Sequence, residues 1–178
     1  MMIYIALLKG INVGGHKIIK MQALAEMFAA LGFEKITTFI QSGNVVFAYK
    51  KNSTEILANS ISKKIKEVFG FDVNVIVKTK EELEFVFNNN PFAKDDMNKL
   101  YISFLSTVPK EKNIDLGNYD DAEYKIVNDV VYMFFHKKIS DSKLANNVNE
   151  KKLHVDIVTT RNWKTVTQLV QLASRLFE

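Results

Sequence analysis

The chain has 178 residues, of which 47% are hydrophobic and 25% charged, a composition that excludes disorder over most of its length. Its 24 basic residues exceed its 20 acidic residues by only four, so the charge permits an anionic partner without indicating one. The absence of cysteine excludes disulfides, thiolate nucleophiles and cysteine-based zinc sites. The apolar residues 1–8 lack a basic stretch and are too few to cross a bilayer, so we expect a buried strand and a cytoplasmic protein.

The first part of the chain predicts one α+β lobe over residues 1–78. Apolar spacing and β-rich runs indicate strand, helix, strand, strand, helix and strand over residues 3–8, 21–31, 35–40, 45–49, 56–69 and 73–77. A glycine-rich loop from Lys9 to Lys17 follows the first strand, and Gln41-Ser42-Gly43-Asn44 joins two strands as a hairpin. This order is that of the split βαβ, or ferredoxin-like, unit, whose two helices we expect on one face of the sheet.

Residues 79–98 predict a connecting helix and linker, and residues 99–178 a second α+β lobe. A capping-box pattern, Thr79-Lys80-Glu81-Glu82, opens the connecting helix, and Pro91 follows its end. The second lobe is predicted to hold a strand, a short helix begun by Pro109, a two-stranded hairpin and a last helix over residues 100–105, 109–114, 123–136 and 163–177. Because this order partly repeats the first, we predict tandem ferredoxin-like lobes, the second a partial copy.

Five stretches carry a resemblance to a known family. They are ALLKGINVGGH, IQSGNVVF, NPF, SKL and TTRNWKTV, at residues 6–16, 40–47, 90–92, 142–144 and 159–166. They resemble the motifs of a bacterial family catalogued as domain of unknown function 1697, in the same order. The resemblance implies two related α+β lobes and no established activity. The chain departs from the family at Lys9, where arginine is usual, and at His154, where glycine is usual; lysine cannot replace arginine in a bidentate contact.

The glycine loop nearly spells a phosphate-binding loop but has His16, Lys17 and Ile18 where that motif needs lysine followed by serine or threonine. Two interpretations stay open: a loop that contacts a ligand, or a tight turn that needs Gly14 and Gly15. No histidine cluster has metal-ligand spacing, and no serine has the flanking pattern of a nucleophile elbow. We therefore predict no metal, no cofactor and no catalytic residue.

Topology predicts where the two longest motifs meet. In the split βαβ order the first two strands run in the same direction, so the loop after strand one and the hairpin after strand two emerge at one edge. Residues 159–162, if they cap the last helix, add a third anion-favouring element; alternatively, Arg161 and Trp163 only tie that helix to its own lobe. The predicted ligand-binding residues are Lys9, Asn12, Gly14, Gly15, His16, Lys17, Gln41, Ser42, Asn44, Arg161 and Asn162.

Three functions follow from this predicted cleft. The first is binding of an anionic or phosphate-bearing ligand, with a small molecule favoured over nucleic acid and no membrane partner. The second is an enzyme acting on an anionic small molecule, with His16 as general acid or base. The third is a protein-interaction module whose motifs only maintain loop geometry. Whether the protein is an enzyme stays open at this point.

Overall fold

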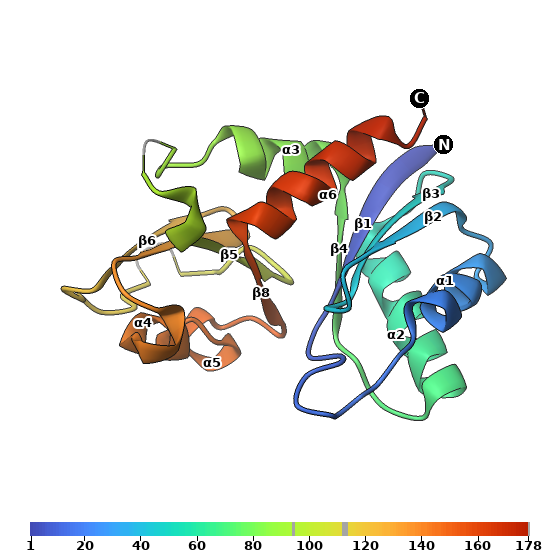
Figure 1. The fold of residues 1–178 in the computed structure, drawn as a ribbon, viewed down its shortest axis with the longest axis horizontal. Helices are drawn as coiled ribbons and strands as arrows, with labels where there is room; N and C mark the ends of the chain where they lie inside the picture. Colours follow the sequence, from blue (N-terminus) through green and yellow to red (C-terminus); the bar gives the residue numbers. More distant parts are fainter. Residues whose placement is uncertain (94, 112–113, 178) are drawn as a thin grey trace. The chain divides into compact units, whose positions relative to one another are not determined.

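The computed structural model describes residues 1–93, 95–111 and 114–177 (Figure 1). The chain is a mixed α+β protein with two four-stranded antiparallel sheets and six α-helices in the described residues. It divides into two compact units. The first holds Met1–Phe85 and the described residues from Gln168 onwards, and the second holds the described part of Val86–Thr167.

The first unit has the element order that the sequence predicts. Its elements are β1 (Met2–Leu8), α1 (Met21–Ala30), β2 (Glu34–Phe39), β3 (Asn44–Tyr49), α2 (Thr54–Phe69) and β4 (Val75–Thr79). The strands lie in the order β2-β3-β1-β4, and all neighbours are antiparallel. Helix α2 begins at the cap Ser53, whose Oγ accepts from Ile56 N, and ends at Gly70 with φ 81°. The sequence predicted the same helix end at residue 69.

Helices α1 and α2 pack on the same face of the first sheet, as predicted (Figure 1). Alternate side chains of β1, including Tyr4 and Leu8, share one buried core with Phe28 of α1 and Ile61 of α2. The side chains between them, such as Leu7, are fully buried as well, so the opposite face of the strand is also covered. Burial on both faces explains why β1 is a continuous apolar run instead of an alternating one.

The second unit repeats the strand order, but among its described residues no α-helix lies between its first two strands. Its elements are β5 (Leu100–Leu105), β6 (Ala122–Val127), β7 (Val130–Phe135), α4 (Lys143–Asn147), α5 (Glu150–Leu153) and β8 (Val158–Asn162). The strands lie in the order β6-β7-β5-β8, so each sheet places its second, third, first and fourth strand side by side. The predicted hairpin over residues 123–136 is confirmed: β6 and β7 pair antiparallel, and the turn between them holds Asn128 with φ 53°.

The short helix predicted over residues 109–114 is wrong for its described part. Residues 109–111 and 114 are not helical, and residues 112–113 lie outside the described residues. Among residues 109–114 only Ile114 is a large apolar side chain besides Pro109, so the segment has no apolar stripe to bury. A helix this short is unstable without such packing.

The two helices that follow the fourth strands each have residues in both units. Helix α3 (Lys80–Asn88) follows β4 directly through the predicted capping box: Thr79 N donates to Glu82 Oε2 at 2.8 Å, and Glu82 N donates to Thr79 Oγ1 at 3.2 Å. Helix α6 (Trp163–Arg175) begins in the second unit, whereas the residues from Gln168 belong to the first, although the sequence assigned the whole helix to the second lobe. Apolar periodicity shows that a helix has a buried stripe but not which body covers it.

The C-terminal residues contact β2 through one side chain. Lys35 Nζ donates to Leu176 O at 3.2 Å and lies 4.3 Å from the centre of the Phe177 ring. These contacts are consistent with the grouping of this segment with the first unit. Over the described residues, no helix has both the length and the apolar composition needed to cross a membrane.

Candidate functional site

The glycine loop forms a miniature β-hairpin. Val13 O accepts a hydrogen bond from His16 N at 3.0 Å, and the two residues between them, Gly14 and Gly15, have φ values of 57° and 76°. Two successive positive φ angles between hydrogen-bonded strand residues define a type I′ turn, which glycine allows without strain. The two glycines therefore form a tight turn, and whether this loop also contacts a ligand stays a prediction. The first helix begins only at Met21, so these amides do not form its N-terminus as they would in a phosphate loop.

Asn12 joins the two longest motifs. Its Oδ1 accepts from Ile19 N at 2.8 Å, and its Nδ2 donates to Ile19 O at 3.0 Å and to Gln41 O at 2.8 Å. Its own backbone N donates to Lys17 O at 3.2 Å, which closes the base of the miniature hairpin. The predicted meeting of the glycine loop with the Gln41–Asn44 turn is confirmed, and one amide side chain holds the two together.

The Gln41-Ser42-Gly43-Asn44 motif maintains its own turn. Asn44 is fully buried, and its Nδ2 donates to Phe39 O at 3.2 Å and to Ser42 Oγ at 3.0 Å. Gly43 has φ 76°, and a Cβ at this position would lie 2.7 Å from Leu8 Cβ, closer than atoms can approach. Leu8 N donates to Gly43 O at 2.8 Å. Thus Asn44 and Gly43 fix the turn against β1, and Gln41 is the exposed residue of this motif.

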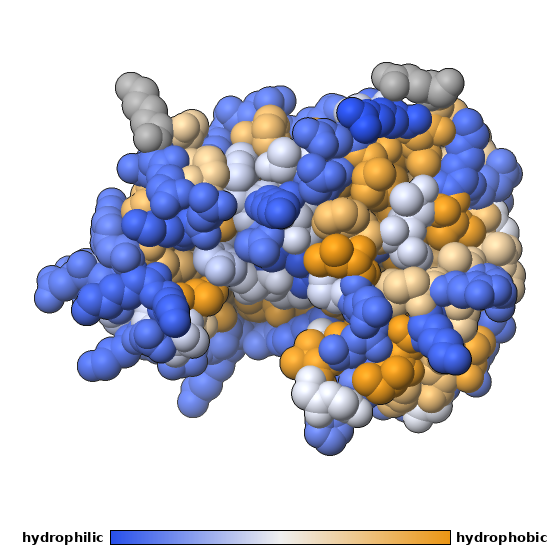
Figure 2. Space-filling model, viewed as in Figure 1, coloured by the Kyte–Doolittle hydropathy of each residue, from blue (hydrophilic) through white to orange (hydrophobic). Residues whose placement is uncertain are grey.

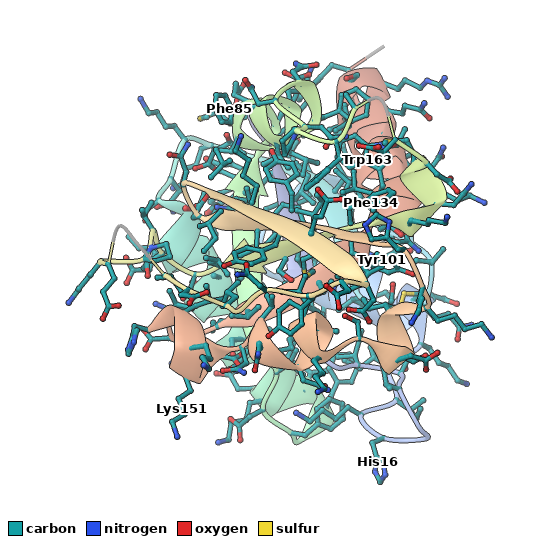
Figure 3. All side chains as sticks on the ribbon, turned by 90° about the vertical axis from the view of Figure 1, so that its left-hand side faces the viewer. His16, Phe85, Tyr101, Phe134, Lys151 and Trp163 are labelled. Carbon is teal, nitrogen blue, oxygen red and sulfur yellow. The ribbon has the colours of Figure 1, made fainter. Side chains whose placement is uncertain are left out.

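Basic side chains are exposed at this edge. His16, Lys17 and Lys20 are exposed and Lys9 is partly buried. Figure 3 shows His16 at the tip of its loop, pointing away from the protein. Lys17 Nζ donates to Asp72 O at 2.6 Å, which ties the hairpin to the segment before β4. The edge therefore displays positive charge on a backbone that is held in place at its base.

Apolar side chains lie among these charges. Val13, Ile18 and Ile40 are 63%, 59% and 50% exposed. In Figure 2 the lower end of the first unit, where the glycine loop lies in Figure 1, carries orange apolar surface beside blue polar surface. A patch of this mixed kind is typical of sites that contact another molecule.

The third predicted element belongs to the second unit. Asn162 Oδ1 accepts from Thr165 N at 2.8 Å, so Asn162 caps α6 as predicted. Arg161 is only 8% exposed, and its Nη1 donates to Thr159 Oγ1 and to Thr160 O, both at 2.9 Å. Burial lowers the pKa of the Arg161 guanidinium to about 10, so it stays protonated at neutral pH. That Arg161 and Asn162 belong to the same site as the glycine loop stays a prediction.

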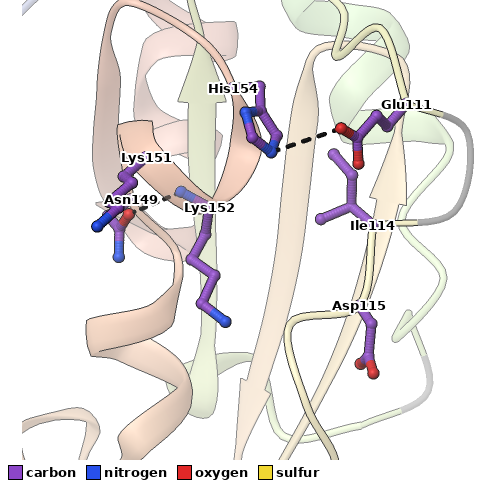
Figure 4. A pocket seen from close by; sticks show the side chains of 7 residues that line it. All are labelled: Glu111, Ile114, Asp115, Asn149, Lys151, Lys152 and His154. Carbon is purple, nitrogen blue, oxygen red and sulfur yellow. Dashed lines mark hydrogen bonds and ion pairs between the residues drawn. The ribbon is translucent and has the colours of Figure 1, made fainter.

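Two cavities in the second unit were not predicted from the sequence. One, of about 430 Å³, lies beside α5 and is drawn in Figure 4. The other, of about 410 Å³, is lined by residues around the start of β5, including Tyr101, and by residues just after β7, including His136 and Lys137. The side chain of His136 is about half exposed. The consecutive lysines at 137 and 138 were the only sequence signal for this site. Among the described residues, no group of three His, Asp or Glu side chains could hold a metal ion.

Comparison with known proteins identifies a family and a fold. No curated protein matches the chain. Among solved structures, the conserved bacterial protein SP0830 from Streptococcus pneumoniae is similar with a TM-score of 0.75 and 21% sequence identity, covering 98% of this chain and 99% of that chain. This likeness shows a shared fold. Residues 1–132, which include the glycine hairpin and the Gln41–Asn44 turn, match the family described as protein of unknown function DUF1697, and the chain belongs to that family.

Proposed function

We propose that the protein binds an anionic, phosphate-bearing ligand at the edge formed by the glycine hairpin and the Gln41–Asn44 turn. The observation that carries this proposal is the Asn12 side chain, which bonds to both segments and holds them as one surface. A surface fixed before binding loses less conformational entropy when a ligand arrives. The charge of the two segments then decides which ligand fits.

Both segments lack acidic residues. Residues 9–20 contain Lys9, His16, Lys17 and Lys20 and no Asp or Glu, and residues 35–51 contain no Asp or Glu either. The nearby Asp72 directs its backbone carbonyl to Lys17, while its carboxylate pairs with Lys66 at 2.9 Å. Lysine ammonium groups act as point charges toward phosphate, so this edge favours a phosphate group without demanding bidentate geometry.

The enzyme alternative has less support at this edge. His16 has no side-chain hydrogen bond or ion pair to the rest of the described chain, and it is exposed. A histidine that acts as general base is normally oriented by a second group. We therefore favour binding over catalysis.

The test compares two charge-matched variants. Binding of a fluorescein-labelled single-stranded oligonucleotide of about 12 nucleotides, a length within the site size of small single-strand-binding domains, is followed by anisotropy over a series of salt concentrations. The double variant K17Q/K20Q removes two charges at the proposed edge. The control K50Q/K51Q removes two exposed charges after the end of β3, whereas Asn44 at the proposed edge lies at its start.

We expect K17Q/K20Q to weaken binding and to reduce the slope of log affinity against log salt by about 1.4, because each lysine–phosphate pair contributes about 0.7 to that slope on a single strand. The control should leave the slope unchanged. Competition by ATP would identify a compact phosphate ligand, and its absence an extended nucleic acid. Equal effects of the two variants, or no binding of either probe, would overturn the proposal.

A protein-interaction module is the second candidate, and the exposed Val13, Ile18 and Ile40 favour it. Aliphatic side chains surrounded by charge are common at protein interfaces. The double variant V13S/I18S separates the candidates. It should leave phosphate binding unchanged if the lysines are responsible.

We also interpret the two units as tandem ferredoxin-like lobes acting in the cytoplasm. Their sheets share one strand order, and in each unit the last residue of the fourth strand caps the helix that follows, Thr79 for α3 and Asn162 for α6. The second unit lacks a helix between its first two strands in the described residues, so it would be a partial copy. A chain without cysteine needs no oxidising compartment.

A further inference from the structure

We propose a second ligand site, for a small phosphate ester, in the cavity of about 410 Å³ in the second unit. Strands β5 and β7 are antiparallel, with Leu100 opposite Phe134 and Tyr101 opposite Met133. The start of β5 therefore lies at the same edge of the sheet as the end of β7. The segments that extend these two strands form the walls of the cavity.

The walls carry a surplus of positive charge. Lys99, Lys137 and Lys138 line the cavity together with His136, and no acidic side chain of the described residues does. Two carboxylates stand nearby: Asp96 Oδ2 lies 3.9 Å from Lys99 Nζ, and Glu123 Oε1 lies 3.1 Å from His136 Nε2.

The two consecutive lysines lack such neighbours. Within the described part of the chain, Lys137 and Lys138 have no carboxylate at ion-pair distance. Both are exposed, so their ammonium groups can move to meet an anion.

An apolar wall accompanies the charges. Tyr101, which is labelled in Figure 3, is partly buried and makes an edge-to-face contact with Phe135, their ring centres 5.6 Å apart, which fixes the phenol ring. Ile139 adds a partly buried aliphatic side chain. A cavity of this volume is within the range of small-molecule sites, which combine an apolar lining with a few polar groups. The lysines can bind a phosphate group, and the side of the cavity formed by Tyr101 can accommodate a ring or carbon skeleton.

The cavity beside α5, in the same unit, serves as a control for the proposed site (Figure 4). Its volume, about 430 Å³, is nearly the same. Lys151 and Lys152 contribute two positive charges and Glu111 and Asp115 two negative charges, so the described lining residues have a formal charge of zero with histidine neutral. Glu111 Oε1 also lies 3.5 Å from His154 Nε2. The two cavities therefore differ in charge more than in size.

The experiment measures binding of AMP by isothermal titration calorimetry to the full chain, with adenosine and citrate as comparison ligands. Adenosine retains the ring and lacks the phosphate, and citrate retains multiple negative charges on carboxylates. The double variant K137Q/K138Q should weaken AMP binding roughly tenfold, because it removes two charge-assisted hydrogen bonds to the phosphate. The matched variant K151Q/K152Q removes the same charge beside the other cavity and should leave the AMP affinity within about twofold of wild type, as expected for lysines outside the site.

Three results would overturn the inference: no saturable binding of AMP, binding that K137Q/K138Q does not weaken, or binding of adenosine or citrate as tight as that of AMP. The site is also independent of the edge proposed above. K17Q/K20Q should leave AMP binding to this cavity unchanged, while K137Q/K138Q should leave the salt slope of oligonucleotide binding unchanged. Failure of one proposal is thus distinguishable from failure of the other.

Discussion

Replacement of Asn12 by alanine should destabilise the first unit, because one side chain makes three hydrogen bonds to two segments. Each bond contributes about 1 kcal/mol net. The backbone of Asn12 has φ 56°, a left-handed conformation that costs alanine about 1 kcal/mol more than asparagine. Because the site is partly exposed, water replaces some of the missing partners. We expect the free energy of unfolding to fall by about 2 to 4 kcal/mol.

Two further variants at this position separate the contributions. Asn12→Gly removes the same hydrogen bonds but tolerates the positive φ, so it should be less destabilising than Asn12→Ala by about 1 kcal/mol. Asn12→Asp keeps the acceptor for Ile19 N but loses the donor to Ile19 O and Gln41 O. It also brings a carboxylate against two carbonyl oxygens, so it should cost about 2 to 3 kcal/mol.

The assay is urea unfolding followed by far-UV circular dichroism, because the only tryptophan, Trp163, belongs to the second unit and its fluorescence would report on the other body. The control is Asn74→Asp, the same chemical change at an exposed side chain, which should alter stability by less than about 0.5 kcal/mol. If Asn12→Asp were as stable as this control, Asn12 would not hold the two segments together and the reasoning for the proposed edge would be refuted.

Three other predictions concern backbone conformation and a buried hydroxyl. Gly43→Ala should cost about 2 to 4 kcal/mol in urea unfolding, from its φ of 76° and its overlap with β1, whereas Gly32→Ala, with φ 80° and open space, should cost only the conformational share of about 1 to 2 kcal/mol. Burial raises the pKa of Tyr132 to about 12, so the folded state binds its proton more tightly and wild-type stability should fall by about 2 to 3 kcal/mol as pH rises from 10 to 12. The stability of Tyr132→Phe should not fall over this pH range. At pH 7 the variant should be less stable than wild type by about 1 to 3 kcal/mol, because Val86 O loses the hydroxyl that donates to it. Parallel stability profiles of variant and wild type against pH would contradict this prediction. His154, the residue after α5, has φ 51°, so the variant His154→Gly should have a higher melting temperature than His154→Ala. The reverse order would exclude backbone strain at this position.

The spacing of apolar residues along the chain predicted the helices and strands that bury an apolar face of their own. The strand at residues 100–105, the helix ended by Gly70 and the capping box at Thr79 all appear where the sequence placed them. Each depends on spacing or hydrogen bonds within a few residues. Strand β8 was missed because Val158-Thr159-Thr160-Arg161-Asn162 has little apolar character. Its pairing with β5, with Thr160 Oγ1 2.7 Å from Ser103 Oγ, makes it a strand.

The sequence by itself determined the order of elements in the first unit, and with that order the meeting of the glycine loop and the Gln41–Asn44 turn, since strand direction follows from connectivity. Only the tertiary structure decided which polar side chains of those motifs face inward. Asn44 is fully buried while Gln41 is exposed, and both lie in one short turn. The cavity between residues 98–101 and 136–139 could not be predicted from the sequence either, because its walls are far apart in the chain and come together only through β5–β7 pairing. Periodicity reports how a segment buries its own surface, whereas side-chain direction and cavities depend on contacts with distant segments.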